Sequence, residues 1–333
     1  MNRVAASLVT SAAVLAIAAC ADSPTKMTAP STLQPSLSAS SAPVRTHVML
    51  TQGLAEAARN ANPAAVIPIT YHGGPILYQT KVVPVYWAAA PIYTNGPAAG
   101  TFSTSSLAGD HSLVMRFIRS LGGSPYFNIN TTYSDGSNVP VQNSVTATGF
   151  WADNTNVPAN GAVVTDAQLI GVLQSGFDTG KLLYDASTIY PIFTAGLVNP
   201  GGGFGTQYCA YHGYGTVTIG GVSKTVIYAA MPYVQSFVSG CTPNMASPNA
   251  DAAANSVVNV LAHEIEESTT DFHLDAWFDR QGAENADKCA WTFGTIYTTS
   301  NGGKANMNMR GADYLIQRNW IQVPNAGSCA TSF

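Results

Sequence analysis

The clearest pattern of apolar and polar positions lies in residues 252–270, where apolar side chains recur every three or four residues. This spacing is typical of a helix with one apolar face. Asn249 and Asp251 precede the run and can cap the N-terminus of the helix. At about 100° per residue, with His263 set to zero, the apolar side chains fill an arc from about 60° to 220°. We expect that arc to face the core; its members are Val257, Val258, Val260, Leu261 and Ile265.

Two glutamates of this helix fall in different sectors. Glu264 lies near about 100°, inside the apolar arc, whereas Glu266 lies outside it and is expected to be solvated. Burial of an unpartnered carboxylate costs several kcal/mol or causes it to take up a proton. We therefore predict that a cation or a network of donors lies beside Glu264.

Strand and helix patterns alternate along the rest of the chain. The pattern predicts strands at residues 81–87, 139–151, 187–198, 216–219 and 225–234, and helices at residues 50–60, 107–120 and 165–174. This order predicts an α/β (α+β) fold in which a mixed sheet packs against helices. The helix that carries His263 is expected to cross the sheet.

The N-terminal region lacks these patterns. Residues 1–20 combine Arg3 with a short apolar run that ends in Ala19-Cys20, which is typical of a lipoprotein-type signal peptide. The alternative is ordinary signal cleavage, with Cys20 removed. Residues 21–62 begin with a segment rich in Ser, Thr, Pro and Ala and are predicted to be a flexible tether. Residues 63–333 then form the folded domain.

The charge composition narrows the possible partners. The net charge is −4 and only 10% of the residues are charged, so the chain has no basic surface suited to nucleic acid. We expect an exported protein, either a lipoprotein of the cell envelope or an extracellular protein. A lipid on Cys20 would be its contact with the membrane.

Cysteines outside the predicted signal number four: Cys209, Cys241, Cys289 and Cys329. An even number in an exported chain predicts two disulfides, for which three pairings exist. The pairing of Cys209 with Cys241 and of Cys289 with Cys329 closes the shortest loops, and it is the one we prefer. The second bridge would tie the loop that holds Asp287 to the end of the chain.

The helix also carries the strongest candidate chemistry, in the segment His263-Glu264-Ile265-Glu266-Glu267. His263 and Glu267 are four residues apart, on nearly one helix face, so their side chains can share a metal ion. The zincin motif H-E-x-x-H has this geometry, with the first glutamate as general base. We therefore predict His263 and Glu267 as ligands of a divalent metal and Glu264 as the base. Zinc is the first candidate, although a carboxylate ligand is harder than imidazole.

A third ligand is expected downstream, where Glu284 and Asp287 follow Glu267 by 17 and 20 positions. Either can complete the site. Rival acids are Asp271, Asp275 and Asp279. In the alternative without a metal, His263 packs at the helix edge and Glu264 pairs with an arginine.

Two other histidines, His72 and His212, are flanked by glycine and aromatic residues. Such surroundings suit an imidazole that contacts a substrate or lies beside a metal. We interpret both as hydrogen-bonded structural histidines rather than ligands.

Taken together, these segments resemble the phosphate-induced protein 1 family, also called EXORDIUM-like proteins. The landmarks that carry the resemblance are residues 71–75, 209–213, 262–267, 276–278, 284–289 and 308–320. The resemblance implies an exported protein, since plant members are associated with the cell wall and linked to growth control. This chain differs in its lipoprotein-like start and its smaller number of cysteines, which indicates a bacterial member.

Two functions are therefore expected from the sequence. The first is a metal-dependent hydrolase, most naturally a peptidase, that uses the His-Glu-x-x-Glu site. The second is a non-catalytic binding or signalling protein of the cell envelope on a zincin-like scaffold. Its partner would be a protein or a cell-envelope polysaccharide.

Overall fold

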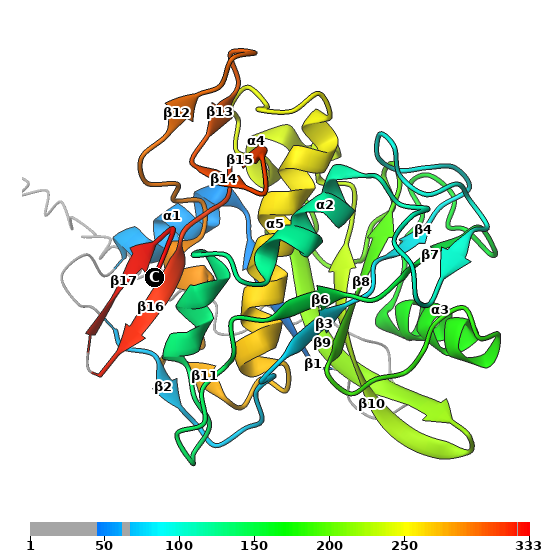
Figure 1. The fold of residues 1–333 in the computed structure, drawn as a ribbon, viewed down its shortest axis with the longest axis horizontal. Helices are drawn as coiled ribbons and strands as arrows, with labels where there is room; N and C mark the ends of the chain where they lie inside the picture. Colours follow the sequence, from blue (N-terminus) through cyan, green and yellow to red (C-terminus); the bar gives the residue numbers. More distant parts are fainter. Residues whose placement is uncertain (1–44, 62–66, 325) are drawn as a thin grey trace, which may run out of the picture. The chain divides into compact units, whose positions relative to one another are not determined.

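A mixed sheet forms the framework of the protein in a computed structural model that describes residues 45–61, 67–324 and 326–333 (Figure 1). Its strand order is β1-β9-β10-β8-β4-β7-β5; in addition, β3 pairs with β8 and β6 pairs with β3. The strands β10, β8, β4 and β7 run parallel, whereas β1, β9 and β5 are antiparallel to their neighbours. The strands of the sheet are β1 (Arg45–Leu50), β3 (Thr80–Val82), β4 (Val85–Trp87), β5 (Phe102–Ser103), β6 (Val145–Ala147), β7 (Phe150–Asp153), β8 (Thr188–Thr194), β9 (Tyr208–Ile219) and β10 (Val222–Met231).

Helices cover both faces of the sheet, and short hairpins follow them in the chain. The helices are α1 (Gln52–Asn60), α2 (Leu113–Leu121), α3 (Asp166–Asp178), α4 (Val238–Cys241) and α5 (Ala252–Asp271), with 3-10 turns η1 (Phe127–Thr132), η2 (Val234–Phe237) and η3 (Asp287–Cys289). The paired short strands are β2 (Thr70–Tyr71) with β11 (Trp277–Phe278), β12 (Tyr297–Thr298) with β13 (Lys304–Ala305), β14 (Met307–Met309) with β15 (Ala312–Tyr314), and β16 (Asn319–Val323) with β17 (Ala326–Ala330).

The period-two alternation of β10 explains why two helices pack on opposite faces. Ile227 and Ala229 point into the core shared with α5, whereas Val226 and Tyr228 join the cluster that contains Leu169 of α3. Figure 1 shows α5 and α3 on opposite sides of the sheet accordingly. The predicted α/β (α+β) fold with a mixed sheet packed against helices is thus confirmed.

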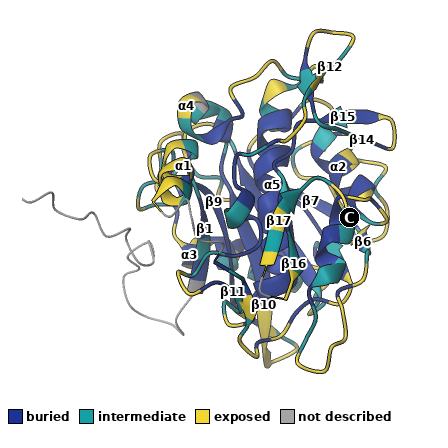
Figure 2. Ribbon diagram, turned by 90° about the vertical axis from the view of Figure 1, so that its left-hand side faces the viewer, coloured by how far each residue is buried: buried dark blue, intermediate teal, exposed yellow. Residues whose placement is uncertain are grey.

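The central helix α5 begins where the sequence predicts, because the Asp251 side chain accepts a hydrogen bond from the Ala254 amide. Every residue from Ala254 to Asp271 is buried, and Figure 2 shows α5 dark along its length. The sheet covers one side of the helix, while α2, η1 and the C-terminal segments contact it elsewhere. The prediction that Glu266 is solvated is therefore wrong, since no side of α5 faces water.

Several element boundaries differ from the sequence prediction. Residues 45–60 belong to the fold as β1 and α1 rather than to the tether predicted over residues 21–62. The helix predicted from residue 107 begins at Leu113, where the Ser112 hydroxyl caps it. The strand predicted over residues 139–151 is reduced to β6 and β7. The predicted signal peptide and Cys20 lie outside the described residues.

Two disulfides join Cys209 to Cys241 and Cys289 to Cys329, which confirms both the predicted number and the preferred pairing. The first links β9 to α4, and the second links η3 to β17. Disulfides of this kind are typical of proteins that fold in an oxidising compartment. Within the parts of the chain that the structure describes, no helix is both long and apolar enough to cross a lipid bilayer.

Candidate metal centre

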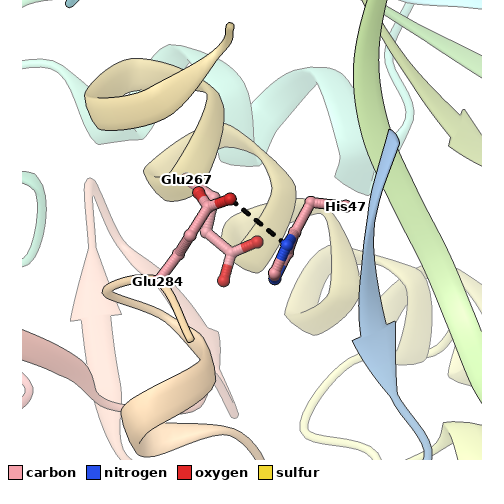
Figure 3. Close-up of side chains that lie close together, drawn as sticks. All are labelled: His47, Glu267 and Glu284. Atoms are coloured by element: carbon pink, nitrogen blue, oxygen red, sulfur yellow. Dashed lines mark ion pairs between the residues drawn. The ribbon is translucent and has the colours of Figure 1, made fainter. Parts of the chain in front are cut away.

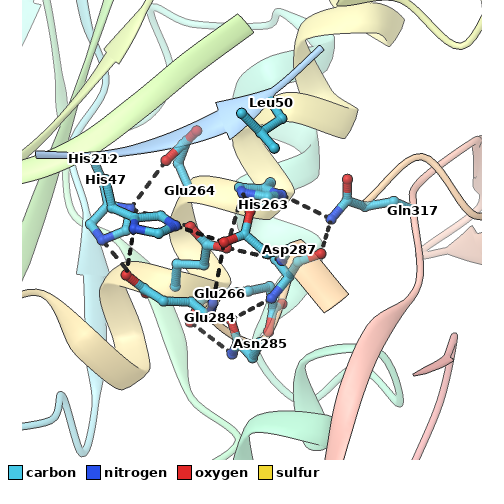
Figure 4. A network of polar contacts seen from close by, with 12 residues as sticks. His47, Leu50, His212, His263, Glu264, Glu266, Glu284, Asn285, Asp287 and Gln317 are labelled. Carbon is cyan, nitrogen blue, oxygen red and sulfur yellow. Dashed lines mark hydrogen bonds and ion pairs between the residues drawn. The ribbon is translucent and has the colours of Figure 1, made fainter. Parts of the chain in front are cut away.

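A cluster of histidines and carboxylates lies between α5 and the sheet (Figure 4). Helix α5 contributes His263, Glu264 and Glu267, and the segment around η3 contributes Glu284 and Asp287. The strands β1 and β9 contribute His47 and His212. We call this set the His-carboxylate cluster; its members are His47, His212, His263, Glu264, Glu267, Glu284 and Asp287.

Strand pairing brings the two sheet histidines together. His47 of β1 is the direct antiparallel partner of His212 of β9, and their ring centroids lie 5.8 Å apart. In β1, His47 lies two residues before Met49, which packs in the core shared with α5. Side chains two residues apart in a strand share a face. Both imidazoles are therefore on the face that packs against α5.

The helix residues that the sequence predicts as ligands, His263 and Glu267, lie close together and near Asp287. His263 Nε2 lies 3.0 Å from Glu267 Oε1 and 3.5 Å from Asp287 Oδ1. The backbone amide of Asp287 donates to Glu267 Oε1 at 3.1 Å, which fixes the η3 segment against the helix. The cluster brings together all five residues that the sequence assigns to the metal site and its base.

Both candidates for the third ligand approach the helix. Asp287 groups with His263 and Glu267, whereas Glu284 groups with His47 and Glu267 (Figure 3). The rival acids have other partners. Asp271 accepts hydrogen bonds from the amides of Asp275 and Ala276, and Asp279 pairs with Lys288. Asp275 follows α5 and donates its amide to Asp271.

Burial governs the protonation of the acids in this cluster. Burial, together with the neighbouring Glu267 charge, raises the pKa of Glu264 well above its usual value. Burial and the charges of Asp271 and Glu267 act in the same direction on the pKa of Glu284. Burial also raises the pKa of Asp287, but its ion pair with His47 outweighs this effect and leaves the pKa lowered.

Two of the histidines, His47 and His212, have pKa values shifted in opposite directions. Burial lowers the pKa of His47, but the Asp287 carboxylate at 2.7 Å outweighs this effect and raises the pKa to about 9. At His212, burial together with the charges of His47 and His263 outweighs the opposing charge of Asp287 and lowers the pKa well below the usual value. The raised pKa values of Glu264 and Glu284 thus favour their protonated forms, and the His47 imidazolium balances part of the remaining negative charge.

The carboxylates of the cluster lack lysine or arginine partners among the described residues, and some of its buried polar atoms lack hydrogen bonds there. Among the described residues, no lysine or arginine forms an ion pair with Glu264, Glu267, Glu284 or Asp287. Several buried atoms of the cluster also have no hydrogen-bond partner within the described part of the chain; they are His212 Nε2, His263 Nε2, Glu264 Oε1, Glu267 Oε2 and Glu284 Oε2. Buried polar atoms normally have a partner. This arrangement can therefore accept a cation.

Glu266 has its own set of partners, on a face of α5 about 60° around the helix from His263 (Figure 4). The side-chain amides of Asn130 and Asn319 both donate to Glu266 Oε2, the second at 2.8 Å. Asn285 Nδ2 donates to the Glu266 carbonyl oxygen at 3.3 Å. Amide donors, rather than solvent, thus surround this carboxylate, which corrects its predicted exposure.

Sequence reasoning missed His47, whereas it singled out His212 as a hydrogen-bonded histidine. His47 lies in the segment predicted to be a tether, and no nearby pattern marks it as functional. His212 lies between an aromatic residue and a glycine, which is the signal that made it a candidate. Its position 3.2 Å from Glu264 Oε2 makes it the partner of the predicted base, and no arginine occupies that place. His72 lies elsewhere, stacked on Phe278 with ring centroids 3.7 Å apart.

These features define a disulfide-bonded α/β protein with a buried His-carboxylate cluster on its central helix. The chain belongs to the phosphate-induced protein 1 family, whose conserved region matches residues 69–320. It is also similar to Protein EXORDIUM-like 3 of Arabidopsis thaliana, with 29% identity over 144 residues, 35% of this chain and 42% of the relative. The match thus spans less than half the length of that relative. No solved structure matches the chain.

Proposed function

We propose that the His-carboxylate cluster binds a divalent metal ion and that the protein is an exported, metal-dependent hydrolase of peptide-like bonds. The observation that supports this proposal is the set of four carboxylates around buried imidazoles without a lysine or arginine partner among the described residues. Removing several carboxylates from water without a cation is costly. A bound divalent ion would supply positive charge and would be coordinated by oxygen and nitrogen atoms that have no hydrogen-bond partner among the described residues.

In this proposal the first ion is held by His263, Glu267 and Asp287. Ligands at about 2.0 to 2.2 Å from zinc in tetrahedral geometry lie about 3.3 to 3.6 Å from one another. The separations of His263 Nε2 from Glu267 Oε1, 3.0 Å, and from Asp287 Oδ1, 3.5 Å, are near that range. Small side-chain rotations suffice to converge the three groups.

Gln317 would orient His263 from the other side of its ring. The Gln317 amide nitrogen lies 3.0 Å from His263 Nδ1 and donates to the carbonyl oxygen of Ala286 at 3.1 Å. A histidine that binds a metal through Nε2 carries its proton on Nδ1 and donates it to an acceptor. Binding through Nε2 would therefore require the Gln317 amide to turn so that its oxygen accepts from Nδ1, and its donation to the Ala286 carbonyl and the bond from the Trp291 amide would be given up.

The donor set favours a metal that accepts both nitrogen and oxygen. One imidazole and two carboxylates suit zinc, while manganese and iron are competitors because carboxylates are hard ligands. Such an ion lowers the pKa of a bound water and polarises a carbonyl group. Glu264 is the proposed proton acceptor, because the charge of a bound ion would offset the effect of burial on its pKa, and His212 Nδ1, 3.2 Å from its Oε2, would position it.

A matched pair of variants tests the hydrolase proposal. Glu264→Gln removes the proton acceptor, whereas Glu266→Gln changes an equally buried glutamate that is bonded to asparagine amides. With casein or a peptide library as substrate, we expect Glu264→Gln to lose roughly 100-fold to 10,000-fold of the turnover. Glu266→Gln should retain it. Equal turnover by Glu264→Gln and the wild type would reject Glu264 as the base.

Deep burial favours a second function, in which the ion is structural and the protein binds an envelope partner. The side chains of His212, His263, Glu264 and Glu267 are fully buried, and structural metal sites are closed whereas catalytic sites keep an open position. A cavity of about 310 Å³ is lined by other residues, among them Gln235 and Leu315. The partner would be a protein or a cell-envelope polysaccharide, with a lipid on Cys20 as anchor. Bound metal without turnover of any peptide would support this second function.

A further inference from the structure

We propose that the His-carboxylate cluster is a two-ion centre, in which Glu267 bridges the first ion to a second one held by His47 and Glu284. This inference rests on the proposed function for its first ion and adds a second ion and the ligand His47, which the sequence does not predict. Among the described residues, the ligand atoms of the cluster converge in three sets of three, and Glu267 belongs to all of them. A carboxylate shared between sets is the arrangement that bridges neighbouring ions.

The two oxygens of Glu267 are used differently. Oε1 faces His263 Nε2 at 3.0 Å and accepts the Asp287 amide, so it belongs to the first ion. Oε2 is buried and has no hydrogen-bond partner within the described part of the chain; His212 Nδ1 lies 3.5 Å from it. That oxygen is free to bind a second ion. One oxygen of the same carboxylate would then serve each ion.

His47 and Glu284 complete the second set. His47 Nδ1 lies 3.4 Å from Glu284 Oε1, longer than most direct hydrogen bonds and near the separation of two ligands of one ion. Figure 3 shows the carboxylates of Glu267 and Glu284 facing the His47 ring. All three ligand atoms lie within 4.8 Å of one another.

The outer contacts of His47 match those of a metal ligand. Its Nε2 lies 2.7 Å from Asp287 Oδ2, so Nε2 carries the proton and donates it to the carboxylate. With that proton on Nε2, the lone pair of an unprotonated Nδ1 faces Glu284 and is available to bind an ion. Histidines that bind metals almost always donate their other ring proton to a carboxylate, a carbonyl or water. Asp287 would thereby bind the first ion through Oδ1 and orient a ligand of the second through Oδ2.

Glu284 provides the independent sign that a cation belongs here. Its side chain is 2% exposed, and its Oε2 has no hydrogen-bond partner among the described residues. His212 Nε2, the nearest ion-pair neighbour of that oxygen, is 3.8 Å away, beyond hydrogen-bond distance. A buried carboxylate oxygen in this position would be satisfied by a divalent ion. Ions that share bridging ligands lie about 3.5 to 4 Å apart.

The test is the number of ions per chain, which does not depend on activity. The protein is stripped with a chelator, loaded with Zn²⁺ or Mn²⁺, dialysed to remove loose ions and analysed by elemental mass spectrometry. We expect two ions in the wild type and one in His47→Gln, with a magnetically coupled Mn²⁺ signal in the wild type alone. His72→Gln, a histidine outside the cluster, should retain two. Circular dichroism checks that each variant is folded.

The outcomes separate the two proposals. One ion in the wild type rejects the second site but leaves the proposed function intact, whereas no ion rejects both. Two ions in a folded His47→Gln variant also overturn the assignment, since the second ion then has other ligands. Glu284→Gln provides a second route to the same answer. It should bind one ion, and retention of two would exclude Glu284 as a ligand.

Discussion

His47 and His212 are direct partners across the β1-β9 pairing, although 165 positions separate them in the chain. The family region begins at residue 69, so β1 brings His47 to the cluster from outside that region. This strand ties the N-terminal part of the described chain to the His-carboxylate cluster. Changes in β1 should therefore alter the geometry of the cluster.

Stability of the metal-free protein should fall as the pH rises from 6.5 to 9. The folded-state pKa of His47 is about 9, above its unfolded value of 6.5, so its stabilising charge is fully present below 6.5 and is lost through 9. The pKa values of Glu264 and Glu284 are also raised, so a higher pH lowers the stability of the folded protein through these two groups as well. Because a unit of pKa is worth about 1.4 kcal/mol, we expect a loss on the order of 1–3 kcal/mol from His47.

Urea unfolding at several pH values, in the presence of chelator, measures this loss. His47→Gln should show a smaller decline over the same range, because its side chain does not titrate. The pH dependence assigned to His47 is wrong if the variant and the wild type lose stability equally.

Metal binding should raise the unfolding temperature. An ion that binds only the folded state at 100 times its dissociation constant stabilises it by about 2.7 kcal/mol, or about 5–10 °C for a domain of this size. Thermal unfolding with and without Zn²⁺ in the wild type measures the shift. Glu267→Gln, which removes the shared ligand, should unfold at the same temperature in both conditions. A shift of wild-type size in that variant would show that the ion binds elsewhere.

The Glu266 group should contribute to stability without binding metal. Asn130→Ala removes one of two amides that donate to the buried Glu266 carboxylate. Leaving a buried acceptor short of a donor costs about 1–3 kcal/mol. We therefore expect Asn130→Ala to lower the free energy of unfolding by that amount while its ion content stays at the wild-type value. A loss of bound metal in the folded variant would mean that the two polar groups of α5 are not separate.

The disulfide between Cys289 and Cys329 should support the metal centre, because Cys289 follows Asp287 by two residues in η3. Replacing both cysteines with serine opens a crosslink with a sequence separation of 40, which costs about 2–4 kcal/mol. We also expect weaker Zn²⁺ binding, measured by competition with a chelator. In the matched control, Cys209 and Cys241 are both replaced with serine. This variant should also lose stability, but its affinity for Zn²⁺ should change less. An equal loss of affinity in the two variants would argue against a specific role for the η3 crosslink.

The helix and the proximity of His263 to Glu267 were predictable because they depend on local spacing. The positions of Asp251, His263, Glu264 and Glu267 within one helix follow from the period of 3.6 residues, and so does the burial of Glu264. The disulfide pairing followed from loop length alone. The mixed sheet followed from alternating strand and helix patterns.

Long-range packing was not predictable in the same way. The helix pattern alone predicts that Glu266 is solvated. In the structure Asn130 and Asn319, from segments far away in the chain, enclose it. His47 reaches the site only through the register of β1 with β9, which no local pattern encodes. The start of the ordered domain was misplaced for the same reason, because an edge strand is stabilised by its partner rather than by its own composition.

The most direct test of the metal proposal is a crystal structure of protein loaded with Zn²⁺, with diffraction recorded on both sides of the zinc absorption edge. We predict an anomalous difference peak that lies about 2.0 to 2.2 Å from His263 Nε2, a Glu267 oxygen and Asp287 Oδ1. The absence of any anomalous peak within the His-carboxylate cluster, in crystals that are shown by fluorescence to contain zinc, would contradict the account.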